Sequence, residues 1–175
     1  TPPAMKMSVL NKLLEQRAYT DAHTGLPNKG ACEVLLKNKE TVEKHTACIM
    51  FDLNNLKIIN DTKGHSKGDQ LILNFARFLR NIIPKEAFVG RYGGDEFMVV
   101  IYNTSKTEIE DILMQLSREK DSLNSRGNDM PIDYACGWAI SDADGECTIQ
   151  MLLDKADYYM YENKQSRKKS MQSTK

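Results

Sequence analysis

The stretch AFVGRYGGDEFMVVIY, residues 87–102, decides the fold, because it has the pattern of two strands joined by a tight turn. Ala87–Tyr92 and Glu96–Tyr102 are rich in the β-branched and aromatic residues typical of strands. Gly93-Gly94 between them can adopt the positive φ angles that tight hairpin turns require. The stretch therefore predicts a β-hairpin with the acidic pair Asp95-Glu96 at its turn.

Further strands and helices are predicted on either side of this hairpin. Ala47–Phe51 is a short apolar run that ends at Asp52, and Ile132–Ile140 is a second strand-like run. Apolar residues at helical spacing predict helices over residues 7–18, 29–39, 71–82, 109–116 and 149–160. A polar loop is expected before the third of these helices. Strands separated by helices, with one hairpin, indicate an α/β fold in which helices pack on a mixed sheet.

Composition excludes several classes of protein. The chain has 175 residues, enough for one compact domain, and its 24 basic residues balance its 24 acidic residues. This balance gives no general attraction to nucleic acid or to an anionic membrane, so we expect neither as a partner of the domain. Its four cysteines form no CxxC pair, which disfavours a structural zinc site and leaves reduced thiols as the expectation.

The sequence also carries expectations about where the domain is located and whether it is part of a longer protein. The sequence has no signal-peptide pattern, and no apolar run approaches the roughly 20 residues of a membrane helix. We therefore expect a cytoplasmic domain. Because the chain starts at Thr1 rather than at Met, we expect it to be a piece of a longer protein, which could itself be membrane-anchored.

Acidic residues stand where two predicted strands end. Asp52 follows a buried strand, and Asp95-Glu96 lie at the hairpin turn. Carboxylates that converge there would repel one another unless a cation lay between them, and oxygen ligands suit Mg²⁺ or Mn²⁺. The neighbouring glycines would let backbone amides approach phosphates. Alternatively, Asp52 caps a helix and Asp95 is an ordinary turn residue.

Several motifs resemble those of a single family. They are RYGGDEF at residues 91–97, DAHTGLPN at 21–28, FDLNNLK at 51–57 followed by Asn60-Asp61, Gly64-His65 and Gly68-Asp69, and the segment Ala156–Lys164. They make the chain similar to the GGDEF family, the catalytic domain of bacterial diguanylate cyclases, over residues 21–169. Residues 1–20 are then expected to form an N-terminal linker helix, and residues 170–175 a flexible tail.

The resemblance implies a fold, a reaction and partners. The fold is a palm-like nucleotidyl cyclase fold, an α/β (α+β) domain with a five-stranded mixed or antiparallel sheet surrounded by helices. The reaction condenses two GTP molecules into cyclic di-GMP and releases two pyrophosphates. Each domain holds one GTP, so a second copy is needed and a homodimer is implied. The helix at residues 7–18 resembles the linker by which a sensor domain presents two such domains to each other.

The resemblance also assigns roles to residues. The implied metal ligands are Asp52, the carbonyl of Leu53, Asp95 and Glu96, holding Mg²⁺ or Mn²⁺, two ions per site. Asp95 is also the implied proton acceptor for the 3′-hydroxyl, Glu96 has a metal or charge-tuning role, and Lys57 offsets phosphate charge in the transition state.

Further residues are implied to bind the nucleotide. The phosphate contacts are backbone groups of Asn55, Leu56, Gly93 and Gly94 and the side chains of Lys164 and Lys168. The base contacts are Asn60, Asp69 and the nearby His65. An ionised Asp69 only accepts hydrogen bonds, so it suits the N1–H and amino group of guanine and would face a lone pair on N1 of adenine.

Some positions depart from the family pattern. The Arg-x-x-Asp product-inhibition site has Pro84 and Ala87 in its two functional positions, so we expect no feedback through it. His23 and Ala135, where Leu and Ser are common, are interpreted as structural. Two alternatives to the cyclase stay open. One is an idle module that binds GTP or a protein and regulates a neighbouring domain, and the other is a palm-type nucleotidyltransferase that acts on nucleic acid.

Overall fold

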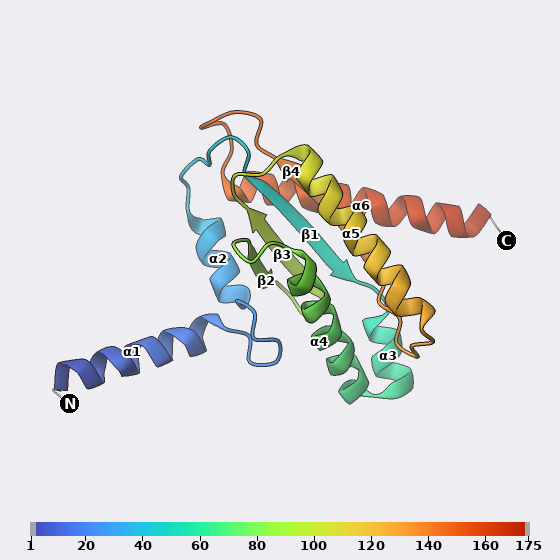
Figure 1. The fold of residues 1–175 in the computed structure, drawn as a ribbon, viewed down its shortest axis with the longest axis horizontal. Helices are drawn as coiled ribbons and strands as arrows, with labels where there is room; N and C mark the ends of the chain where they lie inside the picture. Colours follow the sequence, from blue (N-terminus) through green and yellow to red (C-terminus); the bar gives the residue numbers. More distant parts are fainter. Residues whose placement is uncertain (1–2, 174–175) are drawn as a thin grey trace.

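The computed structural model describes residues 3–173 of the chain. Within them, six helices and four strands follow one another as shown in Figure 1. The elements are α1 (Pro3–Tyr19), α2 (Lys29–Lys37), β1 (Ala47–Leu53), α3 (Leu56–Lys63), α4 (His65–Ile82), β2 (Phe88–Arg91), β3 (Glu96–Ile101), α5 (Lys106–Ser125), β4 (Tyr134–Ile140) and α6 (Ile149–Ser173).

One antiparallel sheet, with strand order β2-β3-β1-β4, forms the centre of the fold. The predicted hairpin is present, and Arg91 pairs with Phe97 at its turn end. The positive φ angles expected at Gly93 and Gly94 are wrong, because neither glycine has one and the turn spans four residues instead of a tight two-residue loop. β1 lies between β3 and β4, with Asp52 opposite Glu96 on one side and opposite Ala135 on the other. The acidic positions of the hairpin and of β1 are therefore brought to the same end of the sheet.

The α/β fold class is confirmed, but the sheet has four strands in residues 3–173, where five were expected, and its paired neighbours are all antiparallel. Segments 42–45 and 141–147 come close to adding a ladder, since Val42 N–H donates to the Cys147 carbonyl at 2.7 Å. However, His45 and Gly145 have φ angles of 71° and 75°. Left-handed backbone at both positions interrupts the extended conformation that a strand needs.

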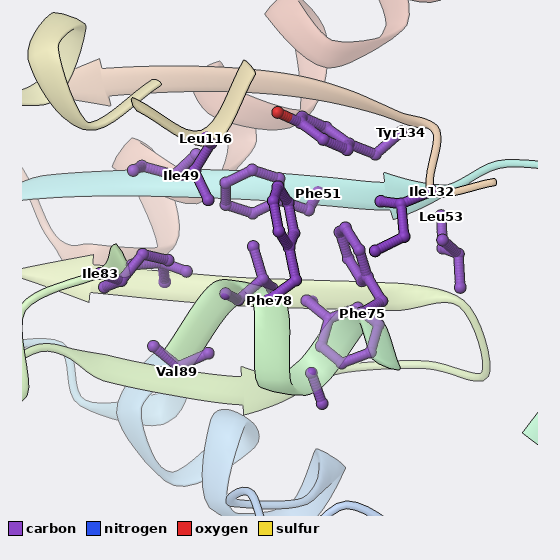
Figure 2. Close-up of a cluster of buried hydrophobic side chains, with 14 of the residues drawn as sticks. Ile49, Phe51, Leu53, Phe75, Phe78, Ile83, Val89, Leu116, Ile132 and Tyr134 are labelled. Atoms are coloured by element: carbon purple, nitrogen blue, oxygen red, sulfur yellow. The ribbon is translucent and has the colours of Figure 1, made fainter. Parts of the chain in front are cut away.

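Alternation along β1 divides the core into two layers. Ile49 and Phe51 point toward α4 and α5, while Cys48 and Met50 point toward α2 and α6. Figure 2 shows the first layer, in which Phe51 lies near Phe75 of α4 with ring centroids 6.2 Å apart. The central strand is thus buried on both faces, which explains its nearly continuous apolar sequence.

Helix α6 packs directly on β4, at a glycine. A Cβ on Gly137 would lie less than 3.0 Å from backbone atoms of Ala156, Tyr159 and Met160. The absence of a side chain there lets α6 approach the sheet closely. α6 continues to Ser173, well beyond the apolar pattern that predicted it, and residues 174–175 of the expected tail lie outside the described part.

Helix α1 confirms the helix predicted at residues 7–18 and extends away from the rest of the fold (Figure 1). Leu10, Leu13 and Leu14 are each at least half exposed.

The prediction of a polar loop before residue 71 is wrong, because α3 and the first turns of α4 occupy this segment. None of the helices in the described residues is long and apolar enough to span a bilayer.

Candidate nucleotide and metal site

Three carboxylates gather where β1 ends and the β2–β3 hairpin turns. Asp52 faces Glu96 across the β1–β3 ladder, and the Leu53 N–H donates to the Asp95 carbonyl at 2.8 Å. Burial raises the pKa of Asp95 above its usual value, and the negative charge of Asp52 raises it further. Burial followed by the charges of Asp52 and Asp95 raises the pKa of Glu96 in the same way. The carboxylates therefore experience one another as like charges.

A single lysine partly compensates for this negative charge. Lys164, from α6, forms an ion pair with Asp52, and its charge lowers the pKa of both Asp95 and Glu96 by less than burial raises it. Within residues 3–173 no three acidic, His or Cys side chains are already arranged around a common metal position. An oxygen-rich, partly buried cluster with excess negative charge is nevertheless the donor chemistry that suits a hard divalent cation.

The loop after β1 leads into a cavity lined by cationic side chains. Asn55 has a left-handed φ of 70° and turns the chain into α3, which starts at Leu56. A cavity of about 320 Å³ lies beside this turn and is lined by Asn54, Asn55, Asp133, Ala135, Lys164, Arg167 and Lys168. Lys164 and Lys168 thus share one cavity with Asn55, as a phosphate site would require.

Asp133 and Arg167 support this cavity and were missed by sequence reasoning. The Asp133 carboxylate accepts hydrogen bonds from Asn54 at 3.0 Å and from Arg167 at 2.9 Å. Arg167 also donates to the Tyr134 carbonyl at 2.7 Å. The pair therefore ties α6 to the loop after β1. No local motif indicates such a contact, since the two residues are 34 positions apart.

The stabilisation of the fold by the Asp133–Arg167 pair should depend on pH. Burial raises the pKa of Asp133, but hydrogen bonds from Arg167 and Asn54 outweigh it and hold the pKa below its usual value. A lowered folded-state pKa stabilises the fold above the unfolded pKa of about 3.9, and this stabilisation is lost as pH falls through the lower folded value. Asp133→Asn should therefore lower the free energy of unfolding by about 1 kcal/mol at pH 7.

Urea unfolding at pH 7 and at pH 3 measures this effect. The difference in the free energy of unfolding between the wild type and Asp133→Asn should shrink at the lower pH, because protonation of Asp133 removes its stabilising contribution. Other carboxylates are common to both proteins, so their effects cancel in the comparison. A difference of equal size at both values would contradict the role of the ionised Asp133.

The residues proposed to read the base lie on α3 and at the start of α4, on either side of the junction between these helices. Gly64, with φ 92°, ends α3 and precedes α4, which starts at His65. Gly68 is buried against Asn60, so that a Cβ there would overlap the Asn60 amide oxygen. Asp69 follows at once and is exposed. Glycine at 68 therefore allows α4 to lie against the Asn60 side chain, one residue before Asp69.

Two assigned side chains are exposed on the helices that follow β1. Lys57 is exposed on the first turn of α3 and does not line the 320 Å³ cavity. His65, the first residue of α4, is also exposed. A larger cavity, of about 430 Å³, lies near the other end of β1, beside Thr46 and Tyr102, and contains none of the assigned site residues. The assigned residues therefore lie at one end of the sheet, on α3, at the start of α4 and in the second half of α6.

The antiparallel sheet between helical layers, with acidic residues at the hairpin turn and at the end of β1, is the arrangement expected of a GGDEF domain. A family model described as "Diguanylate cyclase, GGDEF domain" matches residues 18–170, and the chain belongs to this family.

Two curated relatives and one solved structure illustrate this membership. Signaling protein YkoW of Bacillus subtilis is 30% identical over 90% of the chain, and diguanylate cyclase DgcP of Escherichia coli is 31% identical over 91%. The chain spans only 20% and 48% of these relatives' lengths. The structure of the coiled coil and GGDEF domain of DgcB from Caulobacter crescentus superposes with a TM-score of 0.78. It covers 93% of this chain and 89% of that one at 22% identity, a likeness of fold.

Proposed function

We propose that the chain is a catalytically competent diguanylate cyclase domain that condenses two GTP molecules into cyclic di-GMP. The observation that carries this proposal is the crowding of Asp52, Asp95 and Glu96 beside a cavity lined by Lys164 and Lys168. A cluster of this charge is unfavourable for stability alone, and it suits a triphosphate bound with divalent cations.

The proposed reaction uses Asp95 as the base. A raised pKa makes its carboxylate a better proton acceptor than an exposed aspartate, so it can take the proton of a ribose 3′-hydroxyl. The 3′-oxygen then bonds to the α-phosphorus of the second GTP, the bond from that phosphorus to the β-phosphate oxygen breaks, and pyrophosphate leaves. The same step on the other nucleotide closes the ring and releases the second pyrophosphate.

The remaining groups bind and orient the substrate. Lys164 and Lys168 would meet the terminal phosphates, and Lys57 would approach them from the first turn of α3. Backbone N–H groups of Asn55, Leu56 and Gly94 would provide further donors to phosphate oxygens. The Gly93 N–H already donates to the Glu96 carbonyl at 3.1 Å, so Gly93 would contribute by leaving room for the phosphates.

Magnesium or manganese fits the donor set at this site. Asp52, the Leu53 carbonyl, Asp95 and Glu96 would hold it, and two ions are proposed. When bound, the metal supplies Lewis acidity to the phosphates and offsets charge on the departing pyrophosphate. Lys164 would then exchange its ion pair with Asp52 for contact with phosphate.

Completion of the ring requires a second domain. One chain offers one set of site residues, whereas the product joins two nucleotides, so we propose a homodimer as the active form. Because the chain spans half or less of the curated relatives described above, we also propose a sensor domain elsewhere in a longer parent protein. Feedback through Pro84 and Ala87 is not expected, since neither side chain can bind guanine or phosphate by charge.

Asp69 is the side chain proposed to distinguish guanine from adenine. Asp69→Asn should reduce the preference for GTP over ATP by about tenfold, because the amide can donate to N1 of adenine and loses one acceptor for guanine. Competition between the two nucleotides in a binding assay measures the change, and Asp61→Asn, at an exposed position on α3, provides the control. Unchanged selectivity would mean that the base is read elsewhere.

The direct test is incubation of the purified chain with GTP and Mg²⁺ at high protein concentration, with cyclic di-GMP detected by chromatography. Product is the expected result. Bound GTP without product would contradict the cyclase proposal and favour an idle module. Activity that requires a nucleic-acid primer would instead favour a different nucleotidyltransferase.

A further inference from the structure

We propose that His23 is a positioning residue that holds the guanine-reading end of α4 in place. The inference rests on the proposed function, since it takes Asp69 as the residue that reads the base. The His23 Nε2 lies 2.7 Å from the backbone carbonyl oxygen of Asp69, 46 positions further along the chain. A carbonyl oxygen only accepts, so Nε2 carries the hydrogen and donates it. The second lone pair of that oxygen remains for the helix itself.

The contact ties the start of α4 to a distant segment of the chain. It is a tertiary hydrogen bond and not a helix cap, because the imidazole donates, whereas the first N–H groups of a helix need acceptors. Buried Gly68 contacts Asn60 on the side of α3, but Asp69 and its neighbour Gln70 are exposed. The His23 imidazole adds a hydrogen bond to the first turns of α4 from a different part of the chain.

His23 is itself carried by a rigid turn. The Asp21 carboxylate accepts hydrogen bonds from the Thr24 N–H at 2.9 Å and from its hydroxyl at 2.6 Å. The Gly25 N–H donates to the Asp21 carbonyl at 2.8 Å, and the Asp21 N–H donates to the Leu26 carbonyl at 2.7 Å. Since the backbone on both sides of His23 is already ordered, its imidazole loses little further freedom when it binds Asp69.

The same turn also holds the catalytic hairpin. Arg91 donates to the Asp21 carboxylate at 3.2 Å and to the Gly94 carbonyl at 3.0 Å. Its backbone N–H donates to the Pro27 carbonyl at 2.8 Å. One rigid turn therefore contacts the hairpin that carries Asp95 through Arg91 and the helix that carries Asp69 through His23. A bound GTP must span both places, so the turn sets the distance between them.

Two substitutions at the same position test this role. His23→Leu keeps an apolar side chain of similar reach and removes the donor, whereas His23→Gln keeps an N–H donor. The leucine variant should bind the α,β-methylene analogue of GTP about threefold to tenfold more weakly and should discriminate less against the corresponding ATP analogue. The glutamine variant should recover most of the affinity. In turnover, the KM for GTP should rise more than kcat falls.

A second measurement separates this inference from the cyclase proposal. Amide hydrogen exchange across residues 65–73, measured without nucleotide, should be faster in His23→Leu than in the wild type and in His23→Gln. Equal exchange rates in the wild type and both variants would overturn the proposal. Faster exchange in His23→Leu with unchanged affinity for the GTP analogue would also overturn it, because the contact would then be merely structural. A wild type that makes no cyclic di-GMP would contradict the proposed function, while both readouts for His23 would remain measurable.

Discussion

Replacement of Asp95 by Asn should lower the rate of cyclic di-GMP formation by about a thousandfold or more. The amide keeps the size of the carboxylate but can neither accept the 3′-hydroxyl proton nor bind a divalent cation as an anion. Loss of a general base typically costs a factor of about 10²–10⁴ in rate, and loss of a metal ligand adds to it. The rate is measured with saturating GTP and Mg²⁺, by chromatography of the product.

The same substitution should leave the fold intact or make it more stable. Burial and the charge of Asp52 raise the pKa of Asp95, which means that the folded state disfavours its ionised form. A neutral amide relieves this repulsion, so thermal unfolding should occur at an equal or higher temperature. A substitution that lowers activity and raises stability is expected where like charges lie close together in an active site.

Asp111→Asn provides the matched control, because Asp111 is exposed on α5 and has none of the assigned roles. It should leave both the rate and the unfolding temperature unchanged. Substantial cyclase activity in Asp95→Asn would contradict the assigned base. A large fall in its unfolding temperature would show that the carboxylate serves the fold instead.

Local sequence patterns predicted much of the architecture. The apolar run that ends at Asp52 forms β1, and the Gly93-Gly94 step forms the turn of a hairpin. These features depend on residues close together in the chain, where turn chemistry and burial act directly on the backbone. The placement of Asp52 opposite Glu96 then follows from the antiparallel register of β1 and β3.

The features that sequence reasoning missed depend on contacts between distant segments. The Asp133–Arg167 pair and the contact from His23 to Asp69 each join a loop to a helix far away in the sequence. A single sequence contains no periodicity that indicates such pairs. The helix α3 was missed for another reason, since its sequence LKIINDTK is polar and includes the β-branched residues that weaken helix propensity.

The contact between β4 and α6 leads to the second large expected effect. Gly137→Ala should lower the free energy of unfolding by about 3 kcal/mol, at the upper end of the usual cost of overpacking. The added Cβ would lie less than 3.0 Å from backbone atoms of Ala156, Tyr159 and Met160. Backbone cannot rotate away as a flexible side chain can, so α6 must shift. For a chain of this size, the melting temperature should fall by about 6–12 °C.

The shift should also reach the 320 Å³ cavity, because α6 carries Lys164 and Lys168 beyond the point of contact. Gly137→Ala should therefore weaken GTP binding even at temperatures where the variant is folded. Gly94→Ala is the control for stability, since an added Cβ there meets no atom within 4 Å. It should change the melting temperature by no more than about 1–2 °C, the range of an exposed substitution. If Gly137→Ala unfolds at the temperature of the wild type, α6 does not lie on β4 as closely as the structure has it, and the position of both lysines would have to be revised with it.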